Sequence, residues 1–299
     1  GRPPGRGRST SAAPGGVLPL EVTSTQWEHR SGRDVMRLAS GPVEVDGRRT
    51  PERELGPALA AGRDATVHAL GDDRVRRRTP PPDRDLRTEA EVMEHVRAQG
   101  YPVPQVFRVG PGEMVLERIE GPTMLEAIEA KVWQVDRHAR VLADLHTRLH
   151  ALAPPADLTP HVEAALAGDA IVHQDLHPGN VLLAPAGPVV IDWTNARRAD
   201  PDTDVALTWL LMAAFDHDVD PPTGSLPHRL VTRVERAAEP RLRARLVRTF
   251  LRASGRLDQA RALLPAVAAH RLHDPNVRPG EADAICALVT RETGRPLPA

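Results

Sequence analysis

The spacing of apolar and polar residues predicts short strands in the first half of the chain and long helices in the second half. Apolar runs bounded by turn residues predict four strands, over residues 65–70, 74–78, 103–109 and 113–118. The turn Gly71-Asp72-Asp73 joins the first two strands as a hairpin. Helical spacing of Ala90, Met93 and Val96 predicts one helix over residues 86–99. These elements together predict a small sheet with one helix.

The rest of the pattern is mainly helical. Leu142, Leu145 and Leu149 recur at helical spacing within residues 135–152, which indicates a buried amphipathic helix. An apolar helix that runs to Phe215 follows. The last predicted helices, rich in Ala, Leu and Arg, cover residues 226–254, 257–272 and 280–293.

These patterns divide the chain into three parts. Residues 1–50 form an N-terminal extension whose start is rich in Gly, Pro, Ser and Arg, a composition typical of disorder. Residues 51–118 form a sheet lobe, and residues 119–299 form a larger, mainly helical lobe. The predicted fold class is therefore α+β.

The candidate chemistry lies in one stretch of the helical lobe. Residues 173–180 read His-Gln-Asp-Leu-His-Pro-Gly-Asn, and Ile191-Asp192-Trp193 follows shortly after. The apolar runs on either side of the turn at residues 185–188 predict a two-stranded hairpin. Because its strands are antiparallel, the hairpin brings Asn180 and Asp192 to the same end.

The residue types in this stretch suit phosphoryl transfer. Asn180 and Asp192 supply oxygen ligands of the kind that Mg²⁺ prefers, and Mg²⁺ takes few protein ligands when phosphate and water complete its shell. Asp175 lies on the loop just before the hairpin, where a carboxylate can accept the proton of an attacking hydroxyl. A polar loop with a turn at Pro178-Gly179 and two unrelated acids is the simpler alternative.

The wording His-x-Asp-x-His-Pro-Gly-Asn followed by Ile-Asp-Trp resembles the aminoglycoside phosphotransferase and choline kinase-like family, over roughly residues 55–290. It is also similar, less closely, to the H-R-D-x-x-x-x-N and D-F-G motifs of protein kinases. The resemblance implies a two-lobed protein-kinase-like fold. It further implies Asp175 as catalytic base, Asn180 and Asp192 as Mg²⁺ ligands, and ATP or GTP as the phosphate donor.

The resemblance also implies a phosphate clamp in the sheet lobe. In the family a strand lysine pairs with a helix glutamate, and the matching positions here are Arg77 and Glu89. Arg77 departs from the family, since arginine keeps the positive charge but presents it as a planar fork. The alternative is that residues 76–78 are only the basic side chains of an edge strand.

Two further stretches match the family. Residues 112–122 resemble the hinge between the lobes, which implies that the carbonyl of Glu117 and the amide of Ile119 contact the base of the nucleotide. Asp204, in Asp200-Pro201-Asp202-Thr203-Asp204, matches an acid that holds the catalytic loop by accepting backbone amides, and His173 is expected to support the same loop. A helix N-cap by Asp202 or Thr203 would also explain the acids.

Other polar residues leave alternatives open. His146 and His150 lie four residues apart, a spacing that can bind zinc, although buried structural histidines explain them as well and no third ligand is evident. Acidic residues at 216, 218 and 220 are best explained as a solvated loop, and attraction of a cationic acceptor is the alternative.

Composition narrows the functional class. The net charge of -1 and the aromatic content of 3% do not favour binding to nucleic acid or to an anionic membrane. Cys286 is the only cysteine, which excludes an internal disulfide and fits a cytoplasmic protein. No apolar run is long enough to span a membrane.

The sequence therefore predicts an enzyme that uses ATP or GTP to phosphorylate a hydroxyl of a small molecule, such as an aminoglycoside, an aminoalcohol or a sugar. A non-catalytic, nucleotide-binding regulatory module of the same fold is the alternative. Arg77 in place of lysine and the lack of a clear Gly-rich loop motivate it, whereas Asp175, Asn180 and Asp192 argue against it.

Overall fold

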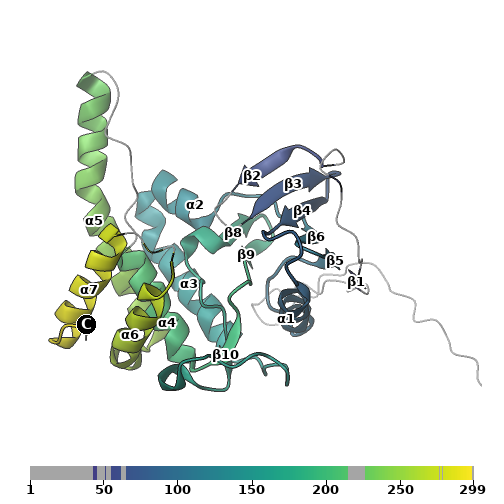
Figure 1. Cartoon of the computed structure of the whole chain (residues 1–299). Helices are drawn as coiled ribbons and strands as arrows, with labels where there is room; N and C mark the ends of the chain where they lie inside the picture. The colour runs from purple at the N-terminus through teal and green to yellow at the C-terminus, as the bar shows by residue number, and fades with distance from the viewer. Residues whose placement is uncertain are drawn as a thin grey trace, which may run out of the picture. The chain divides into compact units, whose positions relative to one another are not determined.

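The structure is a computed structural model, shown in Figure 1. It describes residues 43–45, 51, 55–61, 65–214, 226–275, 277 and 279–297. The predicted extension over residues 1–50, apart from residues 43–45, and the acidic stretch at 216–220 lie outside the described residues.

A six-stranded sheet forms the N-terminal part, with the strand order β1-β5-β6-β4-β3-β2 (Figure 1). Every neighbouring pair is antiparallel except β1 with β5. The strands are β1 (Glu44–Val45), β2 (Ala58–Ala61), β3 (Thr66–Leu70), β4 (Arg74–Arg78), β5 (Val106–Gly110) and β6 (Glu113–Glu117). The pattern predicted the middle four. The edge strands β1 and β2 are short, and the sequence of β2, Ala-Leu-Ala-Ala, has little intrinsic preference for a strand.

Strand β4 lies inside this sheet, between β6 and β3. Arg77 is opposite Val67 on one side and Met114 on the other. The alternative that residues 76–78 belong to an edge strand is therefore wrong. Because side chains alternate along a strand, Arg77 points to the opposite face of the sheet from Arg76 and Arg78.

Helix α1 (Arg87–Ala98) follows β4 and packs against β5. Ala90, Met93 and Val96 are buried, as their spacing predicts. Glu89 lies in the first turn of the helix and is also buried. A buried carboxylate needs a hydrogen-bonding partner. The partner of Glu89 belongs to the candidate site.

The C-terminal part is mainly helical (Figure 1). Its helices are α2 (Met124–Ala130), α3 (Val135–His150), α4 (Pro201–Ala214), α5 (Leu226–Ser254), α6 (Leu257–Leu272) and α7 (Pro279–Thr293). All residues of α4 except Pro201 and Ala213 are buried, and α4 packs against α5, α6 and α7. A helix that is apolar around most of its circumference belongs in a core. None of the described helices is both long and apolar enough to cross a membrane.

Short strands and turns connect these helices. Strand β7 (Ala170–Val172) pairs with β10 (Arg197–Ala199), and β8 (Val181–Ala184) forms a hairpin with β9 (Gly187–Val190). Gly121 has φ +145° and packs closely against β8 in space. A Cβ atom at this position would meet the carbonyl oxygen of Leu183 at 2.2 Å. Glycine is therefore required there for the segment after β6 to approach the hairpin.

The first turn of α4 is capped by Asp200. Its Oδ1 accepts the amide of Asp202 at 2.8 Å, and Pro201 occupies the first helical position. The cap is thus two residues before Asp202 and three before Thr203, the residues that the pattern suggested. The side chain of Asp204 does not cap the helix. It contacts the loop over residues 173–180 instead.

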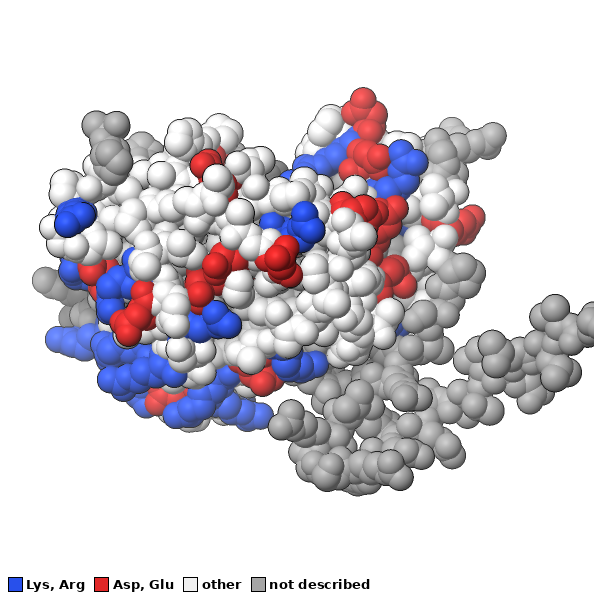
Figure 2. All heavy atoms as spheres, turned by 90° about the horizontal axis from the view of Figure 1, so that it is seen from below, with Lys and Arg blue, Asp and Glu red and all other residues white. Residues whose placement is uncertain are grey.

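The net charge of -1 is unevenly distributed. Figure 2 shows basic side chains gathered along one side of the face seen from below. Helices α3 and α5, which pack together, expose arginines beside the ion pair of Asp136 with Arg245, whose atoms lie 2.7 Å apart. The hydrogen bonds from Arg245 and Thr249 lower the pKa of Asp136 to about 2. Exposed pairs of this kind contribute little to stability.

Candidate active site

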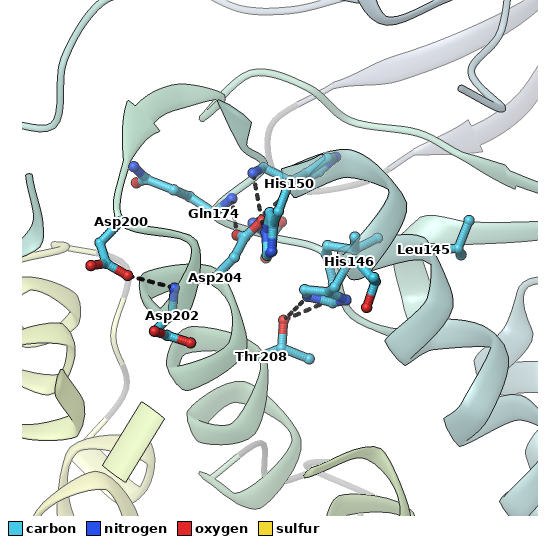
Figure 3. Close-up of polar contacts among 12 residues, drawn as sticks. Leu145, His146, His150, Gln174, Asp200, Asp202, Asp204 and Thr208 are labelled. Atoms are coloured by element: carbon cyan, nitrogen blue, oxygen red, sulfur yellow. Dashed lines mark hydrogen bonds and ion pairs between the residues drawn. The ribbon is translucent and has the colours of Figure 1, made fainter. Parts of the chain in front are cut away.

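The loop over residues 173–180 is held from behind by Asp204 of α4. The carboxylate of Asp204 accepts the amide of His173 at 2.8 Å and the amide of Gln174 at 2.7 Å (Figure 3). Gln174 has φ +62°, a conformation that a residue with a Cβ atom adopts only when its surroundings fix it. Burial raises the pKa of Asp204, but the hydrogen bond from His150 and the other effects of the nearby histidines together outweigh burial, and the pKa is lowered to about 2. The anchor is therefore charged at neutral pH.

His173 joins this loop to the segment that carries Asp192. Its Nδ1 accepts the amide of Asp175 at 3.2 Å, and its Nε2 donates to the carbonyl oxygen of Ile191 at 3.1 Å. The ring is fully buried and meets Trp193 edge-on at 4.7 Å between centroids. Burial lowers the pKa of His173, so a neutral ring makes both bonds.

Asp175 is fixed by Asn180 and faces His177. The amide group of Asn180 donates to the carbonyl oxygen and to Oδ2 of Asp175, both at 2.9 Å. Nε2 of His177 lies 3.5 Å from Oδ1 of Asp175. Burial, followed by the charge of Asp192, raises the pKa of Asp175 to about 7. A carboxyl with a pKa near neutrality is suited to accept a proton.

His177 is held in turn by the next residues of the loop. Its Nδ1 accepts the amide of Gly179 at 3.1 Å, which caps the short 3₁₀-helix η4 (Pro178–Asn180). Burial lowers the pKa of His177 to about 4, so the neutral ring keeps its proton on Nε2 and presents it to Asp175. A Cβ atom on Gly179 would approach Cε1 of His177 at 2.7 Å, which explains the glycine.

The β8–β9 hairpin brings Asn180 and Asp192 to one end, as the motif spacing predicts. Val181 pairs with Val190, and the amide of Ile191 donates to the carbonyl oxygen of Asn180 at 3.0 Å. Asp192 has φ +64°, in the region where Asp and Asn are the most tolerated residues after glycine. Its side chain is 43% exposed, so its oxygens are accessible from solvent.

Arg77 connects the sheet lobe to this hairpin. Its Nη2 donates to Oε2 of Glu89 at 2.5 Å, and its Nη1 lies 3.5 Å from Oδ1 of Asp192. Thr194 completes the cluster, because its hydroxyl contacts Oδ1 of Asp192 at 3.0 Å and Oε2 of Glu89 at 3.3 Å. Thr194 is a site residue that the sequence pattern did not single out, and its position two residues after Asp192 is the only signal the pattern carries for it.

The expected hinge follows β6. The side chain of Glu117 accepts the amide of Gln105 at 3.1 Å, so this carboxylate has a local structural partner. Within the described part of the chain, the amide of Ile119 makes no backbone hydrogen bond. The backbone of this segment, rather than the side chain of Glu117, is therefore the part that suits contact with a ligand.

The donor set at Asn180 and Asp192 fits a hard cation. The side-chain amide of Asn180 donates both of its hydrogens to Asp175. The side-chain oxygen of Asn180 is therefore left as a possible metal ligand. One oxygen of Asp192 accepts Thr194 and Arg77, and no described residue bonds to the other. Among the described residues, no three His, Cys, Asp or Glu side chains form a metal cluster. Two protein oxygens are what Mg²⁺ needs when phosphate and water supply the rest.

The histidine pair of α3 does not form a zinc site. Nε2 of His150 bonds to Asp204 at 3.1 Å, and Nε2 of His146 bonds to the hydroxyl of Thr208 at 3.0 Å. Both ring nitrogens of His146 and Nε2 of His150 thus have partners within the protein. The structural alternative for these histidines is correct.

Comparison with known proteins places the chain in a family. A family profile described as "Phosphotransferase enzyme family" matches residues 56–170 and 161–225, which together cover more than half of the chain. No curated protein matches the sequence.

Several solved structures are similar to this chain, and one with a TM-score above 0.5 shows the same fold. A choline/ethanolamine kinase family protein from Mesorhizobium loti is 16% identical and has a TM-score of 0.51, over 81% of this chain and 89% of that chain. A streptomycin-ATP-APH(2'')-IIa ternary complex is 13% identical with a TM-score of 0.49, over 75% of this chain and 88% of that chain. An aminoglycoside-3'-phosphotransferase of type VIII is 21% identical with a TM-score of 0.42, over 78% and 90%.

The predicted resemblance and the predicted α+β, protein-kinase-like fold are therefore confirmed. The family profile spans the sheet lobe, the loop over residues 173–180 and helix α4, which are the parts that contain the candidate site. The chain belongs to the phosphotransferase enzyme family.

Proposed function

We propose that this protein transfers the γ-phosphate of ATP or GTP, with Mg²⁺, to a hydroxyl group of a small molecule. The acceptor classes that suit the family are aminoglycoside-like compounds, aminoalcohols and sugars. The choline/ethanolamine kinase family relative agrees in name with the aminoalcohol class.

One observation carries this proposal: side chains from the sheet lobe and from the loop over residues 173–180 converge on Asp192. Arg77 of β4 reaches Asp192 from one side, and Asp175 and Asn180 come from the other through the loop and hairpin. Phosphoryl transfer needs positive charge, a metal site and a proton acceptor in one place, because catalysis depends mainly on positioning and electrostatics.

Asp175 is the proposed catalytic base. Its carboxylate takes the proton from the acceptor hydroxyl as that oxygen bonds to the γ-phosphorus and the bond to the nucleoside diphosphate breaks. Asn180 and Asp192 would hold Mg²⁺, which neutralises charge on the phosphates when it is bound. His173 and Asp204 keep the loop in place through the backbone bonds described above.

Arg77 is the proposed phosphate clamp, with Glu89 as the group that orients it. The salt bridge fixes one edge of the guanidinium, and the remaining donors can face the phosphates. The carbonyl of Glu117 and the amide of Ile119 are proposed to contact the base of the nucleotide. This leaves the acceptor site to the helical lobe.

Nucleotide binding should depend on Mg²⁺, because two oxygen ligands are available at Asn180 and Asp192. Isothermal titration calorimetry of ATP and of GTP, each with Mg²⁺ and with EDTA, measures this dependence. We expect clearly tighter binding in the presence of Mg²⁺. Equal affinity in both conditions would contradict the metal assignment.

Turnover tests the function itself. Release of ADP or GDP should be measured against a panel of aminoglycosides, aminoalcohols and sugars, with phosphorylated products identified by mass spectrometry. We expect a product with at least one acceptor class. Mg²⁺-dependent nucleotide binding without any product would instead support the non-catalytic regulatory module.

Replacing Arg77 with methionine should weaken ATP binding by about 10- to 150-fold, as expected when one charge-assisted contact of about 1.5–3 kcal/mol is lost. The melting temperature should also fall, because Glu89 is left buried without its partner. Calorimetry and thermal unfolding measure the two effects separately.

Arg87→Met is the matched control for this variant. Arg87 lies on the same helix as Glu89, but its side chain is 63% exposed and, among the described residues, its ion-pair partner is exposed Asp85. We expect its nucleotide affinity and melting temperature to stay close to those of the wild type. Arg77→Met with unchanged ATP affinity would remove Arg77 from the nucleotide site.

A further inference from the structure

Helices α3 and α4 are connected by two parallel polar contacts behind the catalytic loop (Figure 3). His150 bonds to Asp204, and one helical turn away His146 bonds to Thr208. In each helix the two partners are four residues apart and therefore lie on the same face. Asp204 holds the start of the loop over residues 173–180. Thr208, one helical turn further along α4, lies next to a later part of the same loop.

Thr208 reaches the loop directly after the proposed base. Its hydroxyl donates to the carbonyl oxygen of Leu176 at 2.8 Å. Leu176 lies between Asp175 and His177 in the chain and is fully buried. The main chain around Asp175 is thus contacted from both sides, by Asp204 before it and by Thr208 after it.

His146 and Thr208 have too few hydrogens to make all of their hydrogen bonds at once. Nδ1 of His146 lies 2.9 Å from the carbonyl oxygen of Leu142, and Nε2 lies 3.0 Å from the hydroxyl of Thr208. With the bond from Thr208 to Leu176, three contacts require three hydrogens. A neutral imidazole and one hydroxyl supply only two.

His146 is neutral at pH 7. The ring is 1% exposed, and burial lowers its pKa to about 4, although the charge of Asp204 opposes this effect. One of the three contacts therefore lacks a hydrogen. Which one depends on the nitrogen that bears the proton.

The carbonyl oxygens of Leu142 and Leu176 differ in whether they have a second hydrogen-bond donor. The oxygen of Leu142 lies four residues before His146 in α3 and accepts the amide of the helical turn in any case. The oxygen of Leu176 has only the bond from Thr208 among the described residues. A proton on Nδ1 would leave either this oxygen or Nε2 of His146 buried without a hydrogen bond, because the one hydroxyl hydrogen serves only one of them. A proton on Nε2 leaves only the contact of Nδ1 with the Leu142 oxygen, which already has a partner, so the proton belongs on Nε2.

We propose that His146, as the Nε2–H tautomer, and Thr208 are positioning residues that hold the Leu176 carbonyl and thereby the backbone of Asp175. Nε2–H donates to the Thr208 hydroxyl, and this fixes the hydroxyl so that its only hydrogen points to Leu176. The inference rests on the proposed function of Asp175. It assigns His146 and Thr208 an effect on turnover, not on nucleotide binding.

Three variants test the donor chain. Thr208→Val removes the hydroxyl and keeps the shape. His146→Gln retains an amide donor near the position of Nε2, whereas His146→Asn retains one only near Nδ1. Both histidine variants lose the contact of the ring with Phe250, at 5.1 Å between centroids, so their difference isolates the donor to Thr208.

Thr208→Val and His146→Asn should each lower kcat by about five- to tenfold, the effect of one hydrogen bond between neutral groups. His146→Gln should stay within about twofold of the wild type. The Kd of Mg-ATP should be unchanged in all three. The double variant Thr208→Val/His146→Asn should lose no more than either single variant, because both interrupt the same chain.

Thr203→Val is the matched control. Thr203 is a buried threonine of the same helix, and its hydroxyl has no partner within the described part of the chain. We expect its kcat to equal that of the wild type. A wild-type kcat for Thr208→Val would overturn the proposal, and so would a His146→Asn variant that retains activity while His146→Gln loses it.

Hydrogen–deuterium exchange separates this inference from the proposed function. Amides of residues 173–180 should exchange faster in Thr208→Val and His146→Asn than in His146→Gln and Thr203→Val. If the wild type phosphorylates no acceptor but this exchange pattern holds, the function fails and the anchor stands. If the wild type is active and exchange is equal in all variants, the anchor fails alone.

Discussion

Asp175→Asn should lower turnover by about 10²–10⁴-fold, the usual contribution of a positioned general base. Asparagine keeps the size of the side chain and can still bond to Asn180, but it does not accept a proton. Asp175 is an unfavourable place for a purely structural acid, because burial and Asp192 raise the pKa of this carboxyl to about 7. The melting temperature and the affinity for Mg-ATP should change little.

Steady-state kinetics with the best acceptor, calorimetry and thermal unfolding check this expectation. Asp258→Asn is a suitable control, since the side chain of Asp258 is 90% exposed and pairs only with Arg261. An Asp175→Asn protein that turns over at the wild-type rate would exclude Asp175 as the base. The regulatory-module alternative would then be favoured.

Much of the site could be predicted from the sequence because its central part is local. Asn180 and Asp192 flank one hairpin, and antiparallel pairing of short apolar strands determines that they meet. The alternation of side chains along β4 likewise separates Arg77 from Arg76 and Arg78 once the strand is located. Local periodicity was sufficient in both cases.

Contacts between distant elements could not be predicted in this way. Thr208 and Leu176 are 32 residues apart, and their bond depends on how α4 packs behind the loop. Thr194 became a site residue only when Glu89 of α1 was placed next to it. Strand β2 gave little signal, since the backbone pairing with β3 stabilises it more than its alanines do.

The surroundings of each arginine decide which one can serve as a control for Arg77. Arg76 was the natural sequence neighbour with which to compare Arg77, but its side chain is buried at 6% exposure and lies near Glu113. Replacing it would disturb the opposite face of the sheet. Exposed Arg87 therefore replaces it as the control.

Asp192→Asn should abolish the Mg²⁺ dependence of nucleotide binding, because the charged ligand of the proposed metal site is lost. Even loss of a residue that only supports a ligand typically costs about 10–100-fold in metal affinity, so the effect here should be at least of that order. Asparagine tolerates the φ of +64° at this position, so the backbone should be retained. Arg77 also keeps its salt bridge to Glu89.

Calorimetry of ATP with Mg²⁺ and with EDTA distinguishes Asp192 from Asp175. The Asp175→Asn protein should bind Mg-ATP more tightly than free ATP, as the wild type does, whereas the Asp192→Asn protein should bind both forms equally. Turnover should fall in both variants, so only binding separates the ligand from the base. If Asp192→Asn retains the full response to Mg²⁺, the metal ligand is another residue, and the contact of Asp192 with Arg77 becomes its principal role.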